Sequence, residues 1–298
     1  MIKSVLNKSV WAKWGVVLLA AALMATMVSS CGQQENSSDQ SSDSSISISD
    51  SEPSIDSSIP AEPSDVPSEN NSISTPEQSS EMVGANPYEK YDYSKSVPAG
   101  ATVDNSYFDD AVFIGDSRTQ GFIIYNDLTN ATAYMDKGLK VDTAFTRADI
   151  DVNGVKMTAM DALAQNTTFQ KVYVMLGVNE LGWAYSDIFI EKYGELVDKI
   201  KEIKPDAEIY IQSILPVSEK KSNSDKIYNM TKINEYNSLI QKMAEEKQVY
   251  YLNVAEAVAD DNGYLPEEAS TDGVHLNKEY CAKWLDYLKS HTAENIGR

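Results

Sequence analysis

Beyond Tyr91, short apolar runs alternate with longer segments of helical periodicity, and this alternation constrains the fold more than any other feature of the chain. Apolar runs of this length are typical of strands that are buried on both faces of a sheet. They cover residues 111–114, 131–135, 171–176, 208–215 and 249–254. Because strands that alternate with helices form βαβ units, the pattern predicts a three-layer α/β/α sandwich with a mostly parallel five-stranded sheet.

Two helices between these runs are well marked. Residues 188–203 carry apolar side chains at helical spacing and stop before Pro205, and residues 231–247 repeat the same spacing. In open parallel sheets, ligands bind at the carboxyl ends of the strands. We therefore expect the functional residues directly after the strands.

The N-terminal segment has a different character. A basic start precedes an apolar run over residues 14–28, which is too short to cross a bilayer comfortably but suits a signal peptide. Small residues then precede Cys31, as in the bacterial lipobox, where the cysteine is acylated. We expect residues 1–31 to be a lipoprotein signal peptide and Cys31 to be lipidated, so that the mature chain is anchored to the outer side of the cell membrane. An ordinary signal peptide with a chance cysteine is the alternative.

Residues 32–92 are rich in Ser, Asp, Glu and Pro, and residues 32–89 contain no Lys or Arg. Such a segment buries too little apolar surface to offset the entropy cost of ordering, which predicts a disordered acidic linker. A flexible chain of about sixty residues has a reach of roughly 45 Å. We expect residues 93–298 to form one folded domain held away from the membrane by this linker.

The net charge of -20 argues against a nucleic-acid partner, because binding a polyanion requires clustered Lys and Arg. The chain has only two cysteines, Cys31 and Cys281. If Cys31 is lipidated, no disulfide framework is available. We expect Cys281 to be a buried apolar residue of a helix.

Ser117 follows the first predicted strand in the sequence Gly115-Asp116-Ser117, at the expected start of a helix. Backbone N–H groups are unpaired there, and the helix dipole favours negative charge. Ser117 is therefore a candidate nucleophile, although a helix N-cap is the commoner role of such a serine. The loop lacks the residues of a phosphate-binding P-loop and the flanking glycines of an α/β-hydrolase elbow.

A serine nucleophile needs a base to take its proton and an acid to orient that base. Asp272-Gly273-Val274-His275, after the fifth predicted strand, supplies both residue types, with Gly273 allowing a tight turn. The alternative is a surface histidine beside an ordinary turn aspartate. We expect the other histidine, His291, to be exposed to solvent.

Acyl transfer also requires donors for the developing oxyanion. Asn179 follows the third predicted strand, and Gly138 follows the second. With the backbone N–H of Ser117, these residues are the candidate donors of an oxyanion hole. Taken singly, Asn179 and Gly138 are equally typical of turns.

Together these segments resemble the four sequence blocks of SGNH hydrolases, also called GDSL esterases. The resemblance covers residues 110–291 and implies a flavodoxin-like fold, Ser117 as nucleophile, His275 as base, Asp272 as its acid partner, and oxyanion donors from Ser117, Gly138 and Asn179. Two features depart from the family pattern: no second glycine follows soon after Gly138, and Glu180 stands where many members have Asp.

Three further residues are candidates for substrate binding. Trp183 and Tyr185 have flat faces suited to a sugar ring, with packing in a loop or helix start as the alternative. Arg118 has a charge suited to an anionic substrate, with simple solvation as the alternative. We expect a lipid-anchored, extracytoplasmic serine esterase that needs no metal or cofactor and acts on carboxylic esters, with O-acetyl groups of wall or extracellular polysaccharide as the substrate hypothesis. A non-catalytic glycan- or peptide-binding lipoprotein and an O-acyltransferase with the same triad remain open.

Overall fold

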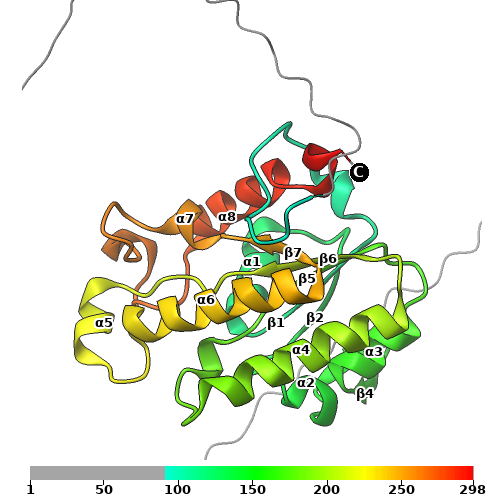
Figure 1. Cartoon of the computed structure of the whole chain (residues 1–298), viewed down its shortest axis with the longest axis horizontal. Coiled ribbons are helices and arrows are strands. Elements are labelled where there is room, and N and C mark those ends of the chain that lie inside the picture. The colour runs from blue at the N-terminus through cyan, green and yellow to red at the C-terminus, as the bar shows by residue number, and fades with distance from the viewer. Residues whose placement is uncertain (1–90, 298) are drawn as a thin grey trace, which may run out of the picture. The chain divides into compact units, whose positions relative to one another are not determined.

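Figure 1 shows a computed structural model of the chain, which describes residues 91–297. The predicted signal peptide over 1–31, the lipidation of Cys31 and all but the last two residues of the predicted linker over 32–92 lie outside these residues. Within them, no helix combines the length and apolar character that a membrane crossing requires.

Five parallel strands form the main sheet in the order β2-β1-β5-β6-β7. They are β1 (Ala111–Gly115), β2 (Thr132–Met135), β5 (Lys171–Met175), β6 (Glu208–Gln212) and β7 (Tyr250–Leu252). Each coincides with one of the five predicted runs, although β6 and β7 end before the apolar residues do. In order of the chain this is the 2-1-3-4-5 arrangement of flavodoxin-like folds. The predicted α/β fold is therefore confirmed.

The described part of the chain also contains eight α-helices and four short 3₁₀ segments. The α-helices are α1 (Ser117–Asn126), α2 (Thr143–Thr146), α3 (Ala159–Gln165), α4 (Ser186–Ile203), α5 (Glu219–Ser224), α6 (Met230–Lys247), α7 (Ala255–Val258) and α8 (Lys278–Ser290). The 3₁₀ segments are η1 (Asn105–Phe108), η2 (Val178–Glu180), η3 (Glu267–Ala269) and η4 (Ala293–Ile296). Helices α4 and α6 lie within two residues of the predicted bounds.

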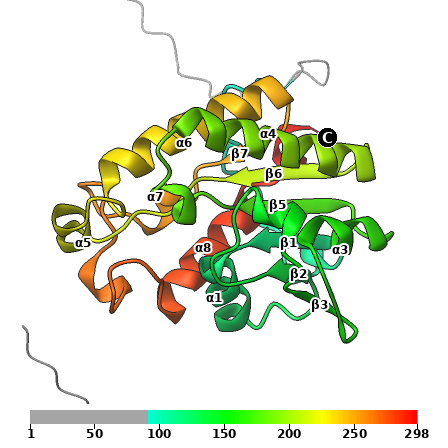
Figure 2. The ribbon, with the colours of Figure 1, turned by 90° about the horizontal axis from the view of Figure 1, so that it is seen from below.

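The side chains of β1 alternate between two apolar cores. Val112 and Ile114 pack in one core with buried residues of α3, α4 and α6, whereas Ala111 and Phe113 pack in the other with residues of α1, α7 and α8. Figure 2 shows the two helical layers on opposite sides of the sheet. A strand buried on both faces reads as a continuous apolar run, which explains why these strands were visible in the sequence.

A two-stranded antiparallel hairpin, β3 (Ile150–Val152) and β4 (Val155–Met157), was not predicted. Its turn consists of Asn153 and Gly154, both with positive φ. Asn-Gly is the preferred pair for such a turn, so this dipeptide was the available signal. Each strand has only three residues and no apolar run.

Strands β1 and β5 are directly paired, with Gly115 opposite Met175. Both strands therefore end at the same level, and the segments that follow them leave the sheet side by side. This pairing places Ser117 and the Gly177–Glu180 segment at one edge of the sheet, as expected from the sequence.

Helix α8, the last long helix of the described chain, is held to the sheet by Trp284. The indole nitrogen of Trp284 donates a hydrogen bond of 2.7 Å to Oε1 of Gln212, and its ring centroid lies 4.3 Å from that of Phe122. Cys281 is buried in the same layer, as predicted. The prediction for His291 was wrong, because the residue is only 9% exposed and its ring stacks on Tyr287.

We expect Trp284→Phe to lower the free energy of unfolding by about 1–3 kcal/mol, the cost of leaving a buried acceptor on Gln212 unpaired. Urea unfolding followed by circular dichroism measures the change. Trp183→Phe is the matched control, because Trp183 is only half-buried. An equal loss in both variants would contradict the importance of the Trp284–Gln212 bond.

Candidate active site

Ser117 is the first residue of α1, directly after the turn that ends β1. Asp116, not Ser117, is the N-cap: Oδ1 of Asp116 accepts a hydrogen bond of 2.8 Å from the backbone N–H of Arg118. The alternative role of Ser117 as a cap is thus wrong, and its hydroxyl is available for another partner. Burial raises the pKa of Asp116, opposed by the Arg118 N–H and the Arg118 charge.

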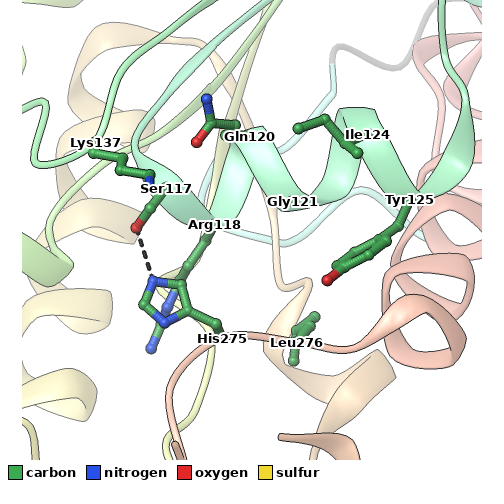
Figure 3. A pocket seen from close by; sticks show the side chains of 9 residues that line it. All are labelled: Ser117, Arg118, Gln120, Gly121, Ile124, Tyr125, Lys137, His275 and Leu276. Carbon is green, nitrogen blue, oxygen red and sulfur yellow. Dashed lines mark hydrogen bonds between the residues drawn. The ribbon is translucent and has the colours of Figure 1, made fainter. Parts of the chain in front are cut away.

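The hydroxyl of Ser117 lies 2.9 Å from Nε2 of His275 (Figure 3), although the two residues are 158 positions apart in the chain. Nδ1 of His275 lies 2.7 Å from Oδ2 of Asp272. A hydroxyl, an imidazole and a carboxylate are therefore joined in series. This is the geometry in which histidine can remove a proton from serine while the carboxylate fixes the imidazole tautomer.

The Asp272 carboxylate is fixed by its own loop. Its Oδ1 accepts bonds from the backbone N–H groups of Val274 and His275, both at 2.9 Å, and from the Ser270 hydroxyl at 3.0 Å. Burial raises the pKa of Asp272, but the hydrogen bonds from His275, Val274 and Ser270 outweigh it and hold this pKa well below its ordinary value. Asp272 is therefore an anion at neutral pH.

Gly273 makes this turn possible, as predicted. Its φ is +75°, and an added Cβ would lie 2.5 Å from the Ser218 hydroxyl oxygen. The Gly273 carbonyl also accepts a hydrogen bond of 2.9 Å from the Ser218 N–H, which ties the turn to the segment that follows β6. A side chain at position 273 would thus disturb both the turn and its support.

Asn179 lies in η2, beside the turn that carries Ser117. Its amide nitrogen donates bonds of 3.2 Å to Oδ2 of Asp116 and to the carbonyl of Leu139. Asn179 thereby joins the segment after β1 to the segment after β2, which contains Gly138. Gly138 has a φ of +73° and open space around the position of a Cβ. The structure brings these residues to one edge of the sheet, while their role as oxyanion donors remains a prediction.

Sequence reasoning treated Glu180 only as a mild departure from the family pattern, but the structure gives it a distinct place. Its side chain is fully buried, and Oε1 accepts a hydrogen bond of 2.8 Å from the backbone N–H of Val141. Oε2 is buried and has no hydrogen-bond partner among the described residues. Burial raises the pKa of Glu180 to about 8, and nearby Asp116 raises it further, whereas the Val141 N–H opposes the change.

The alternative of a simply solvated Arg118 is wrong, since Arg118 is 4% exposed and lines the cavity at Ser117. Its Nη1 donates a hydrogen bond of 2.8 Å to the Leu215 carbonyl, and Nε and Nη2 have no hydrogen-bond partner within the described chain. Burial lowers the pKa of Arg118 to about 10, so the group stays cationic at neutral pH. Trp183 packs against the apolar core and Tyr185 is 65% exposed. Neither of the two lines the cavity at Ser117.

An open cavity of about 510 Å³ lies at the Ser117–His275 pair. Besides that pair and Arg118, its lining residues are Gln120, Gly121, Ile124, Tyr125, Lys137 and Leu276 (Figure 3). Most belong to α1, where residues 117, 121 and 125 follow one another at a spacing of four and so share one helix face. That spacing was the available signal, and sequence reasoning missed it. Within residues 91–297, no group of three or more His, Cys, Asp or Glu is placed to hold a metal ion.

The model of the GDSL-like lipase/acylhydrolase family matches residues 113–280, which is more than half of the chain and includes every residue of the series from Ser117 to His275. The chain belongs to this family. A search of curated proteins finds no match.

Several solved structures are similar to this chain at low sequence identity. A platelet activating factor candidate from Streptococcus pneumonia is 21% identical with a TM-score of 0.51, covering 62% of this chain and 89% of its own. A GDSL lipolytic protein candidate from Desulfitobacterium hafniense is 17% identical with a TM-score of 0.47; the match covers 61% of this chain and 98% of the other. A carbohydrate acetylesterase from Sinorhizobium meliloti is 15% identical with a TM-score of 0.45; the match covers 62% of this chain and 98% of the other.

The raised pKa of Glu180 predicts a pH-dependent effect of Glu180→Gln on stability. Between the ordinary value of 4.5 and about 8, the unfolded chain releases this proton before the folded chain does, so the wild type loses stability as pH rises. Glutamine carries no such proton. We therefore expect the free energy of unfolding of Glu180→Gln, relative to wild type, to increase from pH 5 to pH 8, by at most about 1.4 kcal/mol per pH unit.

Thermal and urea unfolding of both proteins at several pH values measure this difference. Other titrating groups affect the two proteins alike and cancel in the comparison. A difference that does not change with pH would show that Glu180 titrates normally in the folded chain.

Proposed function

We propose that this acylhydrolase cleaves carboxylic esters through an acyl-serine intermediate. The observation that carries the proposal is the series Ser117 Oγ, His275 and Asp272, with contacts of 2.9 and 2.7 Å beside an open cavity. Serine is a weak nucleophile without a base, and this contact supplies one.

In the first half-reaction, Oγ of Ser117 attacks the ester carbonyl carbon while Nε2 of His275 takes the hydroxyl proton. The tetrahedral intermediate collapses, the bond between the carbonyl carbon and the alcohol oxygen breaks, and the alcohol leaves with the proton from His275. In the second half, His275 takes a proton from water, whose oxygen attacks the acyl carbon. The acid leaves, and Ser117 regains its proton. Asp272 stays ionised and stabilises the imidazolium.

The oxyanion would be held by the backbone N–H groups of Ser117 and Gly138 and by the Asn179 amide. The N–H of Ser117 is at a helix N-terminus, where it has no partner within the helix. Both Asn179 contacts are 3.2 Å, at the long end for N–H···O bonds, so an oxyanion can compete for one of these hydrogens. Removing one oxyanion donor typically costs about 10²–10³ in kcat.

For the substrate, we propose O-acetyl groups on wall or extracellular polysaccharide. The Asp272 and His275 side chains are about half exposed, so the reacting atoms are accessible to an ester on a bulky polymer. The cavity over α1 offers an exposed tyrosine face at Tyr125 and polar groups at Gln120 and Lys137. Flat aromatic faces and hydrogen-bonding groups suit a sugar. The lipobox-like sequence at Cys31 and the acidic segment after it suit a lipid-anchored enzyme at the outer face of the cell membrane.

We expect Ser117→Ala to lower the hydrolysis of p-nitrophenyl acetate by at least about 10³-fold, because it removes the nucleophile. The release of p-nitrophenol by residues 91–298, or by the full chain in detergent, measures the rate. Ser106→Ala is a control, because Ser106 contacts only its own turn. Equal activity of Ser117→Ala and wild type would exclude this mechanism.

A fluorophosphonate probe separates this enzyme from a non-catalytic binding protein with the same fold. The probe forms a covalent bond with an activated serine, so mass spectrometry should find one label, on Ser117. Unlabelled wild-type protein would favour the binding protein. Product analysis with sugar acceptors then distinguishes transfer of the acyl group from hydrolysis.

We expect Tyr125→Ala to lower kcat/KM on acetylated glycans about 2- to 13-fold, and less on p-nitrophenyl acetate, because the loss of an aromatic contact costs roughly 0.5–1.5 kcal/mol. Release of acetate measures the first rate. Tyr185→Ala is the matched control, because Tyr185 is also exposed but lies outside the cavity. A loss in Tyr185→Ala alone would move the sugar site to η2 and α4.

A further inference from the structure

The segment between β2 and α2, residues 136–142, contains Gly138 and is here called the Gly138 loop. It has no regular secondary structure, yet two of its side chains, Leu139 and Val141, are fully buried. Their burial draws the backbone of the loop into the protein. A backbone group that is withdrawn from water in this way needs a partner inside the protein.

Two consecutive residues of η2 supply partners to the loop. The Asn179 amide donates to the Leu139 carbonyl at 3.2 Å, and Oε1 of Glu180 accepts from the Val141 N–H at 2.8 Å. The Glu180 bond is the shorter of the two. It fixes the loop at Val141, three residues after Gly138 and at the end of the loop that leads into α2.

The backbone at Glu180 is itself held by side chains of α6. The Tyr236 hydroxyl on α6 donates a hydrogen bond of 3.0 Å to the Glu180 carbonyl, and Nζ of Lys232 donates one of 2.8 Å to the next carbonyl, that of Leu181. The chain around Glu180 is therefore held by a long helix of the sheet-covering layer. Such support allows Glu180 to transmit a fixed position to the Gly138 loop.

A carboxyl group is a costly acceptor at this position. Glu180 is fully buried, Oε2 has no hydrogen-bond partner, and no ion pair to Glu180 is found in residues 91–297. The charged groups that act on Glu180 are Asp116, which disfavours its ionisation, and Lys140, which favours it. Burial without compensation lowers stability, so stability alone does not account for a carboxyl acceptor at this position.

We propose that Glu180 is a positioning residue of the oxyanion hole: by accepting the Val141 N–H, it holds the Gly138 loop so that the Gly138 N–H can reach the oxyanion. This inference rests on the proposed ester hydrolysis. An error in the loop position weakens a contact made only to the transition state, so it lowers kcat and changes KM little.

Three substitutions separate the position of the acceptor from the ionisation of the carboxyl. Glu180→Gln keeps an acceptor at the same distance and loses the ionisable carboxyl. Glu180→Asp keeps the carboxyl but is one methylene shorter and withdraws the acceptor from Val141. Glu180→Met keeps the length and loses the acceptor.

We expect Glu180→Gln to stay within about 3-fold of the wild-type kcat, and Glu180→Asp and Glu180→Met to lose about 10- to 100-fold, part of the effect of a missing oxyanion donor, with KM changed less than about 3-fold. Steady-state hydrolysis of p-nitrophenyl acetate, at a temperature where circular dichroism shows every variant folded, measures both constants. If the reaction needed an ionisable carboxyl at position 180, Glu180→Gln would not keep the wild-type kcat. If Glu180→Met does not fold, the comparison of Gln with Asp decides alone.

Two results would overturn the inference: a loss in Glu180→Gln as large as in Glu180→Asp, or wild-type kcat in Glu180→Asp. Failure of the proposed function has a separate signature, because Ser117→Ala would then be as active as the wild type. A dependence on Ser117 combined with indifference to Glu180→Asp removes only the role of Glu180.

Discussion

The direct pairing of β1 with β5 is the constraint on which the rest of the site depends. In a parallel sheet all strands end at one edge, but only neighbours bring their following segments into contact. Because Gly115 is opposite Met175, Asp116 and Asn179 are close enough to share a hydrogen bond. The strand order also changes direction at this pair: β2 is added on one side of β1, and all later strands of the main sheet are added on the other.

Asp116 uses both carboxylate oxygens at this junction. One oxygen caps α1 and so sets where the helix begins, and the other accepts from Asn179. The position of Ser117 therefore depends on the residue before it and not on its own hydrogen bonds. Because Asp116 caps the helix, the Ser117 hydroxyl is available for His275. A cap and a proposed nucleophile can therefore be neighbours at one helix start.

The fold was predictable because its five central strands are buried on both faces, and continuous apolar runs such as residues 171–176 record that burial in the sequence. Ser117, Asp272, His275, Gly138 and Asn179 were predictable as a set because each follows a strand or precedes a helix. The distances between these residues could not be predicted, because a contact between residues 158 positions apart depends on the path of the whole chain.

What could not be predicted was the burial of polar groups. Glu180 and Arg118 occur in sequence contexts that suit exposed charges, yet both are buried at the site. Burial depends on which loops cover a residue, and the sequence around it does not contain that information. His291 illustrates the same limit, because its shelter comes from stacking on Tyr287 and not from a local apolar pattern.

The buried ionisable groups of this edge also bear on the relation between stability and function. Asp116, Glu180 and Arg118 carry buried side-chain groups, and Oε2 of Glu180 and two nitrogens of Arg118 lack hydrogen-bond partners in residues 91–297. A buried polar atom without a partner lowers the stability of the fold, and the two apolar cores must offset that cost. Such groups gather where the strands end and the hydroxyl, imidazole and amide meet, which is where fixed dipoles would act on the ester in the proposed reaction. In that reaction, the unpaired polar atoms at this edge of the sheet would be the stability cost of a preorganised electrostatic environment.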